Sequence, residues 1–216
     1  MHYDVRSLNR NFDSIDEFIS LLSVQFSVYG FSETWLNDTN DVLIHKNSYR
    51  FINANRSKGK GGGVAFLVHD SLSFKIRYDI AEENDIYENL FIEIDRPGKK
   101  NIIIGIVYRK PSSNINDFTV SISNILHEIL HENKLVYLMG DININLCHSS
   151  SKPVNEFLNM MSSFSLFPVI DKPTRITNNT SSVIDNIFTN DISSHIIPGV
   201  IYSDITDHFP IFSYVI

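Results

Sequence analysis

Apolar residues recur three and four positions apart in three parts of this chain, which is the spacing of an amphipathic helix. The clearest part holds Phe118, Ile122, Ile125, Leu126 and Ile129 on one predicted face. Asparagine or aspartate just before such a segment is a typical helix cap. The predicted helices cover about residues 12–22 behind a capping Asn11, 118–130 behind Asn116 or Asp117, and about 155–164.

Continuous apolar runs elsewhere predict buried strands. Segment 59–80 looks rich in hairpins, and with the two strands that follow it predicts a β-meander, whose turn is Arg96-Pro97-Gly98. The predicted strands are 26–31, 89–94, 101–108, a run from 135 that stops at Gly140, 182–189, 196–202 and 211–215, with 172–174 and 203–210 as polar connections. Along the sequence, the predicted strands follow one another in groups, whereas the predicted helices occur one at a time. This order predicts a four-layered α/β sandwich of two packed, mostly antiparallel sheets flanked by helices.

The composition fits one domain over residues 1–216. A chain of 216 residues with 43% hydrophobic residues can bury one large core. Cys147 is the only cysteine, so no internal disulfide is expected, and the charged first twenty residues leave no room for a signal peptide. The longest apolar run, 102–108, is far shorter than the roughly 18 residues of a membrane span. We therefore expect an intracellular monomer that is neither secreted nor membrane-bound.

The formal charge of −7 argues against a tight, sequence-indifferent binder of polyanions. Any nucleic acid would have to be held by local basic residues and a metal. Two interpretations stay open for the basic residues near the glycine run 61–63 and after the strand 101–108: contact with a nucleic-acid backbone, or solvated surface. These residues are Arg56, Lys58, Lys60, Arg109 and Lys110.

Polar groups follow five of the predicted strands. Taken singly, each is more simply explained as a turn residue, because acids and amides stabilise turns by hydrogen bonding. If the sheets pack with these loops at one end, however, the groups converge in one site. They are Glu33, Tyr108, Asp141 with Asn143, Asp185, and Asp207 with His208.

The end of the strand that starts at Leu135 is the most specific of these places. Residues i and i+2 of an extended chain share a face, so Asp141 and Asn143 are predicted to point into the same space. Several carboxylates without a cysteine or histidine cluster predict an oxygen-ligand site for Mg²⁺ or Mn²⁺ rather than zinc. An aspartate beside a histidine, with a second aspartate to orient the imidazole, suits hydrolysis at phosphorus.

At these residues the chain resembles the endonuclease/exonuclease/phosphatase superfamily, which includes deoxyribonuclease I and the apurinic/apyrimidinic endonucleases. It looks most like the endonuclease domain of LINE-type, non-LTR retrotransposons. The resemblance spans nearly the whole chain, and its segments occur in the family's order. They are "RSLNRNFD" at 6–13, "SETWLND" at 32–38, "GGGVAFLV" at 61–68, "IVYRKPSSN" at 106–114, "LMGDININL" at 138–146, "KPTRIT" at 172–177, "SSVIDNIFTND" at 181–191 and "SDITDHFPIF" at 203–212.

The resemblance implies a Mg²⁺-dependent nuclease that cuts one DNA phosphodiester to leave 3′-hydroxyl and 5′-phosphate ends, in the nucleus. In the family this nick primes reverse transcription. The implied metal residues are Glu33, Asp4 and Asp207. The implied catalytic residues are Asp141 and Asn143 for the attacking water, His208 for the phosphate, Asp185 for the imidazole, and Tyr108 for phosphate contact. Arg109, Thr174 and Asn143 are implied DNA contacts.

The chain departs from the family pattern at its start. Asp4 stands where the family has a metal-site asparagine, and most of the first strand is expected to be missing, which would leave a neighbouring strand with unpaired backbone groups. A carboxylate cannot donate a hydrogen bond as an amide does, and it adds negative charge where a phosphate must enter. No reverse transcriptase follows the last strand, so the chain is expected to be a fragment of a longer element.

Two other functions remain open from the sequence. One is a phosphomonoesterase or phospholipase of the same superfamily, because scaffold and metal permit it. The other is a catalytically dead retrotransposon remnant that binds DNA weakly at most, which Asp4, the short first strand and the acidic charge all favour.

Overall fold

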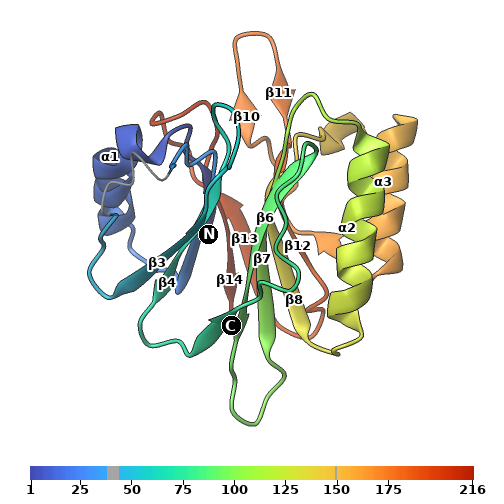
Figure 1. The fold of residues 1–216 in the computed structure, drawn as a ribbon. Helices are drawn as coiled ribbons and strands as arrows, with labels where there is room; N and C mark the ends of the chain where they lie inside the picture. The colour runs from blue at the N-terminus through green and yellow to red at the C-terminus, as the bar shows by residue number, and fades with distance from the viewer. Residues whose placement is uncertain (38–43, 149) are drawn as a thin grey trace.

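The structure is a computed structural model that describes residues 1–37, 44–148 and 150–216, so Asp38 of the segment 32–38 lies outside the described residues. Two six-stranded sheets lie side by side, with helices on their outer sides (Figure 1). A third, two-stranded sheet pairs β10 (Arg175–Ile176) with β11 (Ser181–Ser182) and projects from one end of the molecule. The predicted α/β sandwich of two packed, mostly antiparallel sheets is therefore confirmed.

The first sheet has the strand order β13-β14-β1-β2-β4-β3. β1 and β2 run parallel, whereas the other neighbours are antiparallel. β1 is only three residues long, and it lies between β2 and β14, where His2 is paired with Ile211. The strands are β1 (His2–Asp4), β2 (Val28–Ser32), β3 (Tyr49–Ala54), β4 (Val64–His69), β13 (Ile196–Val200) and β14 (Ile211–Val215).

The second sheet has the order β5-β6-β7-β8-β12-β9. β7 and β8 run parallel, and β12 runs antiparallel to β8, so β12 begins at the edge where β7 and β8 end. The continuous apolar run of β8 is buried on both faces, which is why it shows no polar alternation. The strands are β5 (Phe74–Ile76), β6 (Tyr87–Ile94), β7 (Ile102–Arg109), β8 (Leu135–Asp141), β9 (Phe167–Pro168) and β12 (Asp185–Thr189).

In the part of the chain that the structure describes, three α-helices cover the outer sides of the sheets (Figure 1). α1 (Leu8–Leu21) lies against the first sheet, while α2 (Ile115–Leu130) and α3 (Lys152–Ser163) lie against the second. A short 3-10 helix, η1 (Leu146–His148), follows β8. Among the described helices, none combines the length and the apolar composition needed to cross a membrane.

The helices are where the sequence predicted them, but two caps differ. The cap of α2 is Asn114, whose side chain accepts hydrogen bonds from the backbone N–H groups of Asn116 and Asp117, the two predicted caps. The helix α1 begins before Asn11. The Nδ2 of Asn11 instead donates to the carbonyl of Val5 over 2.8 Å and ties the helix to the end of β1.

The hydrophobic core has three parts, which correspond to the spaces between four layers. The middle part lies between the sheets and includes Val28, Phe66, Ile106 and Met139. A second part packs α2 and α3 on the second sheet, and a third packs α1 on the first. The sheets approach closely at Gly30, where a Cβ atom would press against the side chains of Met139 and Ile106.

Two strand predictions were wrong in detail. Residues 59–80 and the strands after them do not form one meander, because β4 joins the first sheet whereas β5, β6 and β7 follow one another in the second. The predicted strand 182–189 is divided into β11 and β12. β3 was not predicted, since its alternating sequence "YRFINA" lacks a continuous apolar run.

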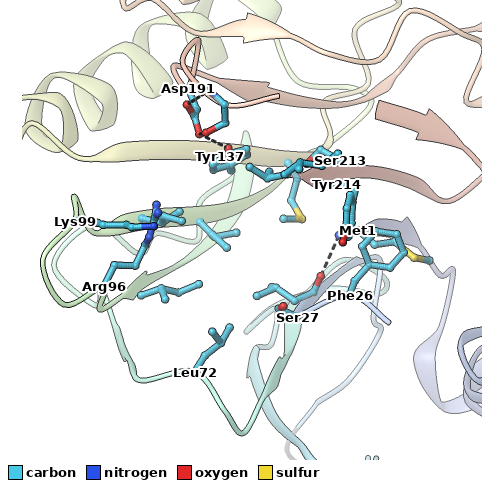
Figure 2. Close-up of a pocket in the computed structure, with 18 of the residues that line it drawn as sticks. Met1, Phe26, Ser27, Leu72, Arg96, Lys99, Tyr137, Asp191, Ser213 and Tyr214 are labelled. Atoms are coloured by element: carbon cyan, nitrogen blue, oxygen red, sulfur yellow. Dashed lines mark hydrogen bonds between the residues drawn. The ribbon is translucent and has the colours of Figure 1, made fainter. Parts of the chain in front are cut away.

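A cavity of about 590 Å³ lies between the sheets near Met1 (Figure 2). The start of β7 lines it, whereas the end of β7 carries Tyr108, so this cavity is at the opposite ends of the strands from the predicted site residues. The Met1 amino group donates to the carbonyl of Val28 over 3.0 Å. β14 pairs with β1 at one residue, Ile211. The residues of β14 that line the cavity come after this one, and they are Ser213, Tyr214 and Val215.

Gly140 is predicted to be essential for the close approach of β7 and β8. Its φ is 152°, and a Cβ atom there would overlap the backbone carbonyl of Val107. Gly140→Ala should therefore lower the free energy of unfolding by about 3 kcal/mol, as expected for overpacking with backbone strain. Gly98→Ala is the matched control, because Gly98 has a φ of 75° in a turn with open space around it. It should cost only about 1 kcal/mol. Equal losses in urea unfolding would contradict this role.

Candidate active site

The strand ends named in the sequence meet at one edge of the molecule. Parallel strands end together, so Asp4 of β1 lies beside the segment after β2, and Tyr108 of β7 lies near Asp141 of β8. The first residue of β12, Asp185, is paired in register with Asp141. Several residues around this edge have a positive φ, which is uncommon outside glycine and clusters at functional sites. They are Arg6, Ser7, Glu33, Trp35 and Asn143.

Asp141 and Asn143 contact each other as the sequence predicted, but not through strand alternation. The strand ends at Asp141, and Asn143 adopts a left-handed conformation with a φ of 48°. In this turn one oxygen of Asp141 accepts from the backbone N–H of Asn143 and the other from its side-chain amide, both over 2.9 Å. The amide also donates to the carbonyl of Arg109, so its direction is fixed.

Asp185 and His208 form a buried ion pair between the two sheets. The Nδ1 of His208, just before β14, donates to the carboxylate of Asp185 over 3.0 and 3.2 Å. Burial alone would lower the pKa of His208, but the carboxylates of Asp185 and Asp4 outweigh it and raise the pKa to about 10. His208 is therefore an imidazolium at neutral pH, and it places a positive charge among the buried acids.

Asp4 is a buried carboxylate with one unsatisfied oxygen. Its Oδ2 accepts from the hydroxyl of Ser32 over 3.0 Å, whereas its Oδ1 is buried and has no hydrogen-bond partner. Burial raises the pKa of Asp4 to about 7, and the nearby carboxylates of Glu33 and Asp185 add to the rise, opposed by His208. Burial and the charges of Asp185 and Asp4 also raise the pKa of Asp141 well above its usual range, again against His208.

These residues fit a divalent cation. Among the described residues, Asp4, Asp141 and His208 each offer a potential ligand atom, and these atoms lie within 4.8 Å of one another. Because His208 is protonated at neutral pH, the available ligands there are carboxylate oxygens, which Mg²⁺ and Mn²⁺ prefer. A cation would pair with the unpartnered Oδ1 of Asp4 and relieve the repulsion between buried acids.

Glu33 lies next to this group and is held by two aromatic side chains. Its Oε1 accepts a hydrogen bond from the hydroxyl of Tyr108, and its Oε2 accepts from the indole Nε1 of Trp35 over 2.5 Å. Burial raises the pKa of Tyr108 well above its usual value, and Glu33 raises it further, so the phenol stays protonated and remains a donor. Tyr108 thereby joins the second sheet to the loop after β2.

The structure does not bring Asp207 into the group of Asp4, Asp141 and His208. Its carboxylate instead pairs with Arg6 over 2.9 Å and with Arg175 over 2.7 Å. Burial works against ionisation of Asp207, but His208, Arg6 and Arg175 outweigh it and hold the pKa below its usual value. As arranged here, Asp207 pairs with two arginines at the rim of the site.

In the structure, the side chains of Arg109 and Thr174, which were predicted to contact DNA, contact backbone groups of the protein. Arg109 is buried, and its guanidinium donates to the carbonyls of Ile142 and Asn143 over 2.7 Å each and to Ser113. The hydroxyl of Thr174 is buried and accepts from the backbone N–H of Asp185 over 3.1 Å. Arg109 therefore supports the loop after β8, and Thr174 supports the start of β12.

Sequence reasoning missed the residues that support Asp4 and His208. The Nε2 of His2 donates to the hydroxyl of Ser32 over 3.0 Å, which in turn donates to Asp4. The hydroxyl of Thr206 donates to the carbonyls of Asp4 and His208. Ser32 and Thr206 are neighbours of Glu33 and Asp207 in the sequence, which was the only available signal. The role of His2 depends on the pairing of β1 with β2 and could not be deduced.

Comparison with known proteins identifies the class to which this fold and site belong. The Endonuclease/Exonuclease/phosphatase family model matches residues 1–208, so the chain belongs to that family of hydrolytic nucleases and phosphatases. No curated protein matches the sequence.

Solved structures of low sequence identity share the fold. The endonuclease domain of TRAS1, a telomere-specific non-LTR retrotransposon, is 14% identical with a TM-score of 0.74, and the match covers 99% of this chain and 95% of that one. The Xenopus laevis APE2 catalytic domain is 12% identical with a TM-score of 0.73, covering 99% and 90%. The Neisseria 3′ phosphatase NExo, bound to a product DNA hairpin, is 10% identical with a TM-score of 0.69, covering 99% and 97%.

Asp4 and His208 are each predicted to contribute less to the stability of the metal-free protein as the pH rises, Asp4 between about 4 and 7 and His208 between about 6.5 and 10. Burial lowers the pKa of His2 to about 4 and that of the Met1 amino group to about 5, so these two groups act in the opposite direction below pH 8. The pKa of Asp4 is raised from 3.8 to about 7 and that of His208 from 6.5 to about 10, so the folded state binds both protons more tightly than the unfolded state. The His208 contribution is complete below pH 6.5 and is lost as the pH rises through 10, whereas deprotonation of Asp4 weakens the fold between pH 4 and 7. Each unit of pKa difference is worth about 1.4 kcal/mol.

Urea unfolding in EDTA at a series of pH values measures this dependence. Relative to wild type, Asp4→Asn should lack the loss of stability that Asp4 causes between pH 4 and 7, and it should also lower the pKa of His208, because the Asp4 carboxylate helps to raise it. A stability difference between wild type and Asp4→Asn that does not change between pH 4 and 7 would contradict the raised pKa of Asp4.

Proposed function

We propose that this chain is a divalent-cation-dependent phosphodiesterase that nicks DNA. The observation that carries the proposal is the buried Asp185–His208 ion pair, which holds an imidazolium beside the carboxylates of Asp4 and Asp141. A fixed cation next to buried acids suits a reaction in which negative charge develops on a phosphate while a water molecule loses a proton.

Asp141 and Asn143 are the proposed residues for the attacking water. Burial raises the pKa of Asp141 well above its usual range, so its carboxylate can accept a proton from water at near-neutral pH. Asn143 is locked against Asp141 and Arg109, which gives its side-chain oxygen one direction in which to orient water or a phosphate oxygen. The water oxygen forms a bond to phosphorus as the bond from phosphorus to the O3′ leaving atom breaks. Asp141 takes the proton that the water loses, and O3′ takes up a proton from solvent to become the 3′-hydroxyl.

His208 is proposed to stabilise the charge that develops on the phosphate. Its Nδ1 is engaged by Asp185, so the opposite edge of the imidazolium is the one directed at substrate. Tyr108 donates to Glu33 and would contact phosphate from the end of β7. Asp4 and Glu33 would hold Mg²⁺ or Mn²⁺, and the bound ion would supply further positive charge at the phosphate. Asp207 would lie close to this site, where its carboxylate would hold Arg6 and Arg175 by ion pairs.

DNA is the proposed substrate because the segments 32–38 and 172–177 resemble retrotransposon endonucleases, and the TRAS1 endonuclease domain shares the fold. Such an enzyme would act in the nucleus, as a monomer, and its nick would serve a reverse transcriptase. The charge of −7 predicts weak binding, since few cations are available to neutralise phosphates.

A Mg²⁺-dependent nicking assay on supercoiled plasmid tests the function. Wild-type protein should convert supercoiled to open-circular plasmid with Mg²⁺ or Mn²⁺ and not in EDTA. Asp141→Ala and His208→Ala should each reduce the rate by about 100-fold or more, as expected for loss of a general base or of a stabilising charge. Lys152→Ala, at an exposed end of α3, is the control that should nick normally. Equal nicking by all variants would rule out the assigned site.

The same preparation should be assayed on an oligonucleotide with a 3′-phosphate, on inositol phosphates and on sphingomyelin. The Neisseria neighbour is a 3′ phosphatase with this fold, so release of phosphate without any nicking would favour a phosphomonoesterase. Hydrolysis of sphingomyelin alone would favour a phospholipase.

A second candidate function is a folded remnant with little activity, and the buried carboxylate of Asp4 favours it. In the deprotonated state Asp4 adds negative charge to a site that must accept an anionic phosphate. If the chain is such a remnant, Asp4→Asn should raise the nicking rate by about tenfold, equivalent to roughly 1.4 kcal/mol in the barrier. Asp13→Asn, at an exposed acid of α1, is the matched control. A lower rate in Asp4→Asn would show instead that the carboxylate is needed for the cation.

A further inference from the structure

The segment 55–63 connects β3 and β4 and is packed against the candidate active site. It contains none of the site's acidic residues. The side chain of Arg56 is only 12% exposed, and its guanidinium lies over the ring of Tyr108, 5.9 Å from the ring centroid. The sequence left open whether Arg56 contacts nucleic acid or solvent, and in the structure most of its side chain is covered by the protein. Its Nε donates to the carboxylate of Glu88.

Glu88 is a buried carboxylate that joins the two sheets. It belongs to β6 of the second sheet, where it is paired in register with Tyr108, and its side chain is 3% exposed. One oxygen accepts from Arg56 and the other from the backbone N–H of Gly63 over 2.5 Å. Both donors lie in the segment 55–63, which connects two strands of the first sheet. A buried carboxylate is costly unless it is paired in this way, so Glu88 fixes the segment 55–63 firmly.

The glycines of this segment reach the loop that carries Glu33. Gly62 and Gly63 have φ values of 72° and 83°, and their carbonyls accept from the backbone N–H groups of Trp35 over 2.8 Å and Thr34 over 3.2 Å. A Cβ atom at Gly62 would overlap the guanidinium of Arg56. The close packing therefore requires glycine, and it fixes the backbone of the loop after β2.

Two chains of contacts lead from Glu88 to Glu33. One passes through Arg56 and the ring of Tyr108, whose hydroxyl donates to Glu33. The other passes through Gly63 and the backbone at Thr34 and Trp35, and the Trp35 indole donates to Glu33. Both oxygens of Glu33 are thus held by groups that depend on Glu88.

We propose that Glu88 and Arg56 are a positioning pair that sets the orientation of Glu33 and Tyr108 for cation binding. The inference rests on the proposed role of Glu33 as a ligand, but not on nuclease activity. The alternative is an ion pair that only stabilises the contact between the sheets. The two differ because a positioning pair changes cation affinity, whereas a stabilising pair changes only the unfolding temperature.

Titration calorimetry with Mn²⁺ alone, on protein without nucleic acid, separates these possibilities. Glu88→Gln should weaken Mn²⁺ binding by about tenfold, the usual effect of losing a group that orients a ligand. Glu83→Gln is the matched control, because Glu83 is an exposed acid that accepts from the backbone N–H of Ser57 in the same segment over 2.9 Å. It should bind Mn²⁺ within twofold of wild type.

A double-mutant comparison tests the route. In a Glu33→Gln background the ligand to be positioned is already altered, so adding Glu88→Gln should weaken Mn²⁺ binding by less than a further twofold. If Glu88→Gln does not fold, Arg56→Gln takes its place, since Arg56 belongs to the same pair and is partly exposed, and the same tenfold loss is expected.

Several results would overturn the proposal. Mn²⁺ affinity within twofold of wild type in a folded Glu88→Gln or Arg56→Gln variant, with only a lower unfolding temperature, would leave a stabilising ion pair. Wild-type protein that binds no Mn²⁺ would also overturn it. Absence of nicking with Mn²⁺ binding intact would instead contradict the proposed nuclease function and leave the positioning pair supported.

Discussion

The buried ion pair between Asp185 and His208 is the interaction on which the site depends. Asp185 begins a strand of the second sheet and His208 precedes a strand of the first, so the pair joins the sheets at the edge where the strand ends meet. It also supplies a positive charge among carboxylates that would otherwise repel one another in a poorly solvated space. Without it, Asp4 and Asp141 would be two buried acids with no compensating cation.

Much of the remaining structure supports this arrangement. Thr174 holds the backbone at Asp185, Thr206 joins the backbones of Asp4 and His208, and Arg109 holds the loop of Asn143. On the other side, Glu88 and Arg56 support Tyr108. These residues are buried or partly buried, and most of their hydrogen-bonding groups bind the protein itself. An active site that must keep acids at fixed positions needs such a shell, because a small displacement changes both charge and geometry.

The sequence predicted the layers and the location of the site for definite reasons. Helical spacing at Phe118 to Ile129 and the apolar runs of β7 and β8 correspond directly to what is buried. The chemistry-bearing residues were identified because each follows such a run. β3 was missed because its sequence has no continuous apolar run, and the division of residues 59–80 between two sheets depends on long-range pairing that no local pattern records.

Within the site, residue types were predicted better than their contacts. Asp141 and Asn143 do meet, but a left-handed turn brings them together, and only the structure shows that conformation. Arg109 and Thr174 were predicted to bind substrate, but in the structure both side chains are buried and form hydrogen bonds with backbone atoms. Asp207 looked like a metal ligand but is neutralised by Arg6 and Arg175. Which of several groups a side chain contacts depends on distances in three dimensions. The spacing of residues along the sequence does not reveal it.

The central claim is that buried acids from the two sheets create a site for a divalent cation around Asp4. The most direct measurement is the anomalous scattering of Mn²⁺ in crystals of the wild-type protein grown with MnCl₂. We expect a single strong peak for Mn²⁺ about 2.2 Å from a carboxylate oxygen of Asp4, with Glu33 also in contact with the ion. No peak at Asp4, or a peak only at exposed acids elsewhere on the surface, would contradict it.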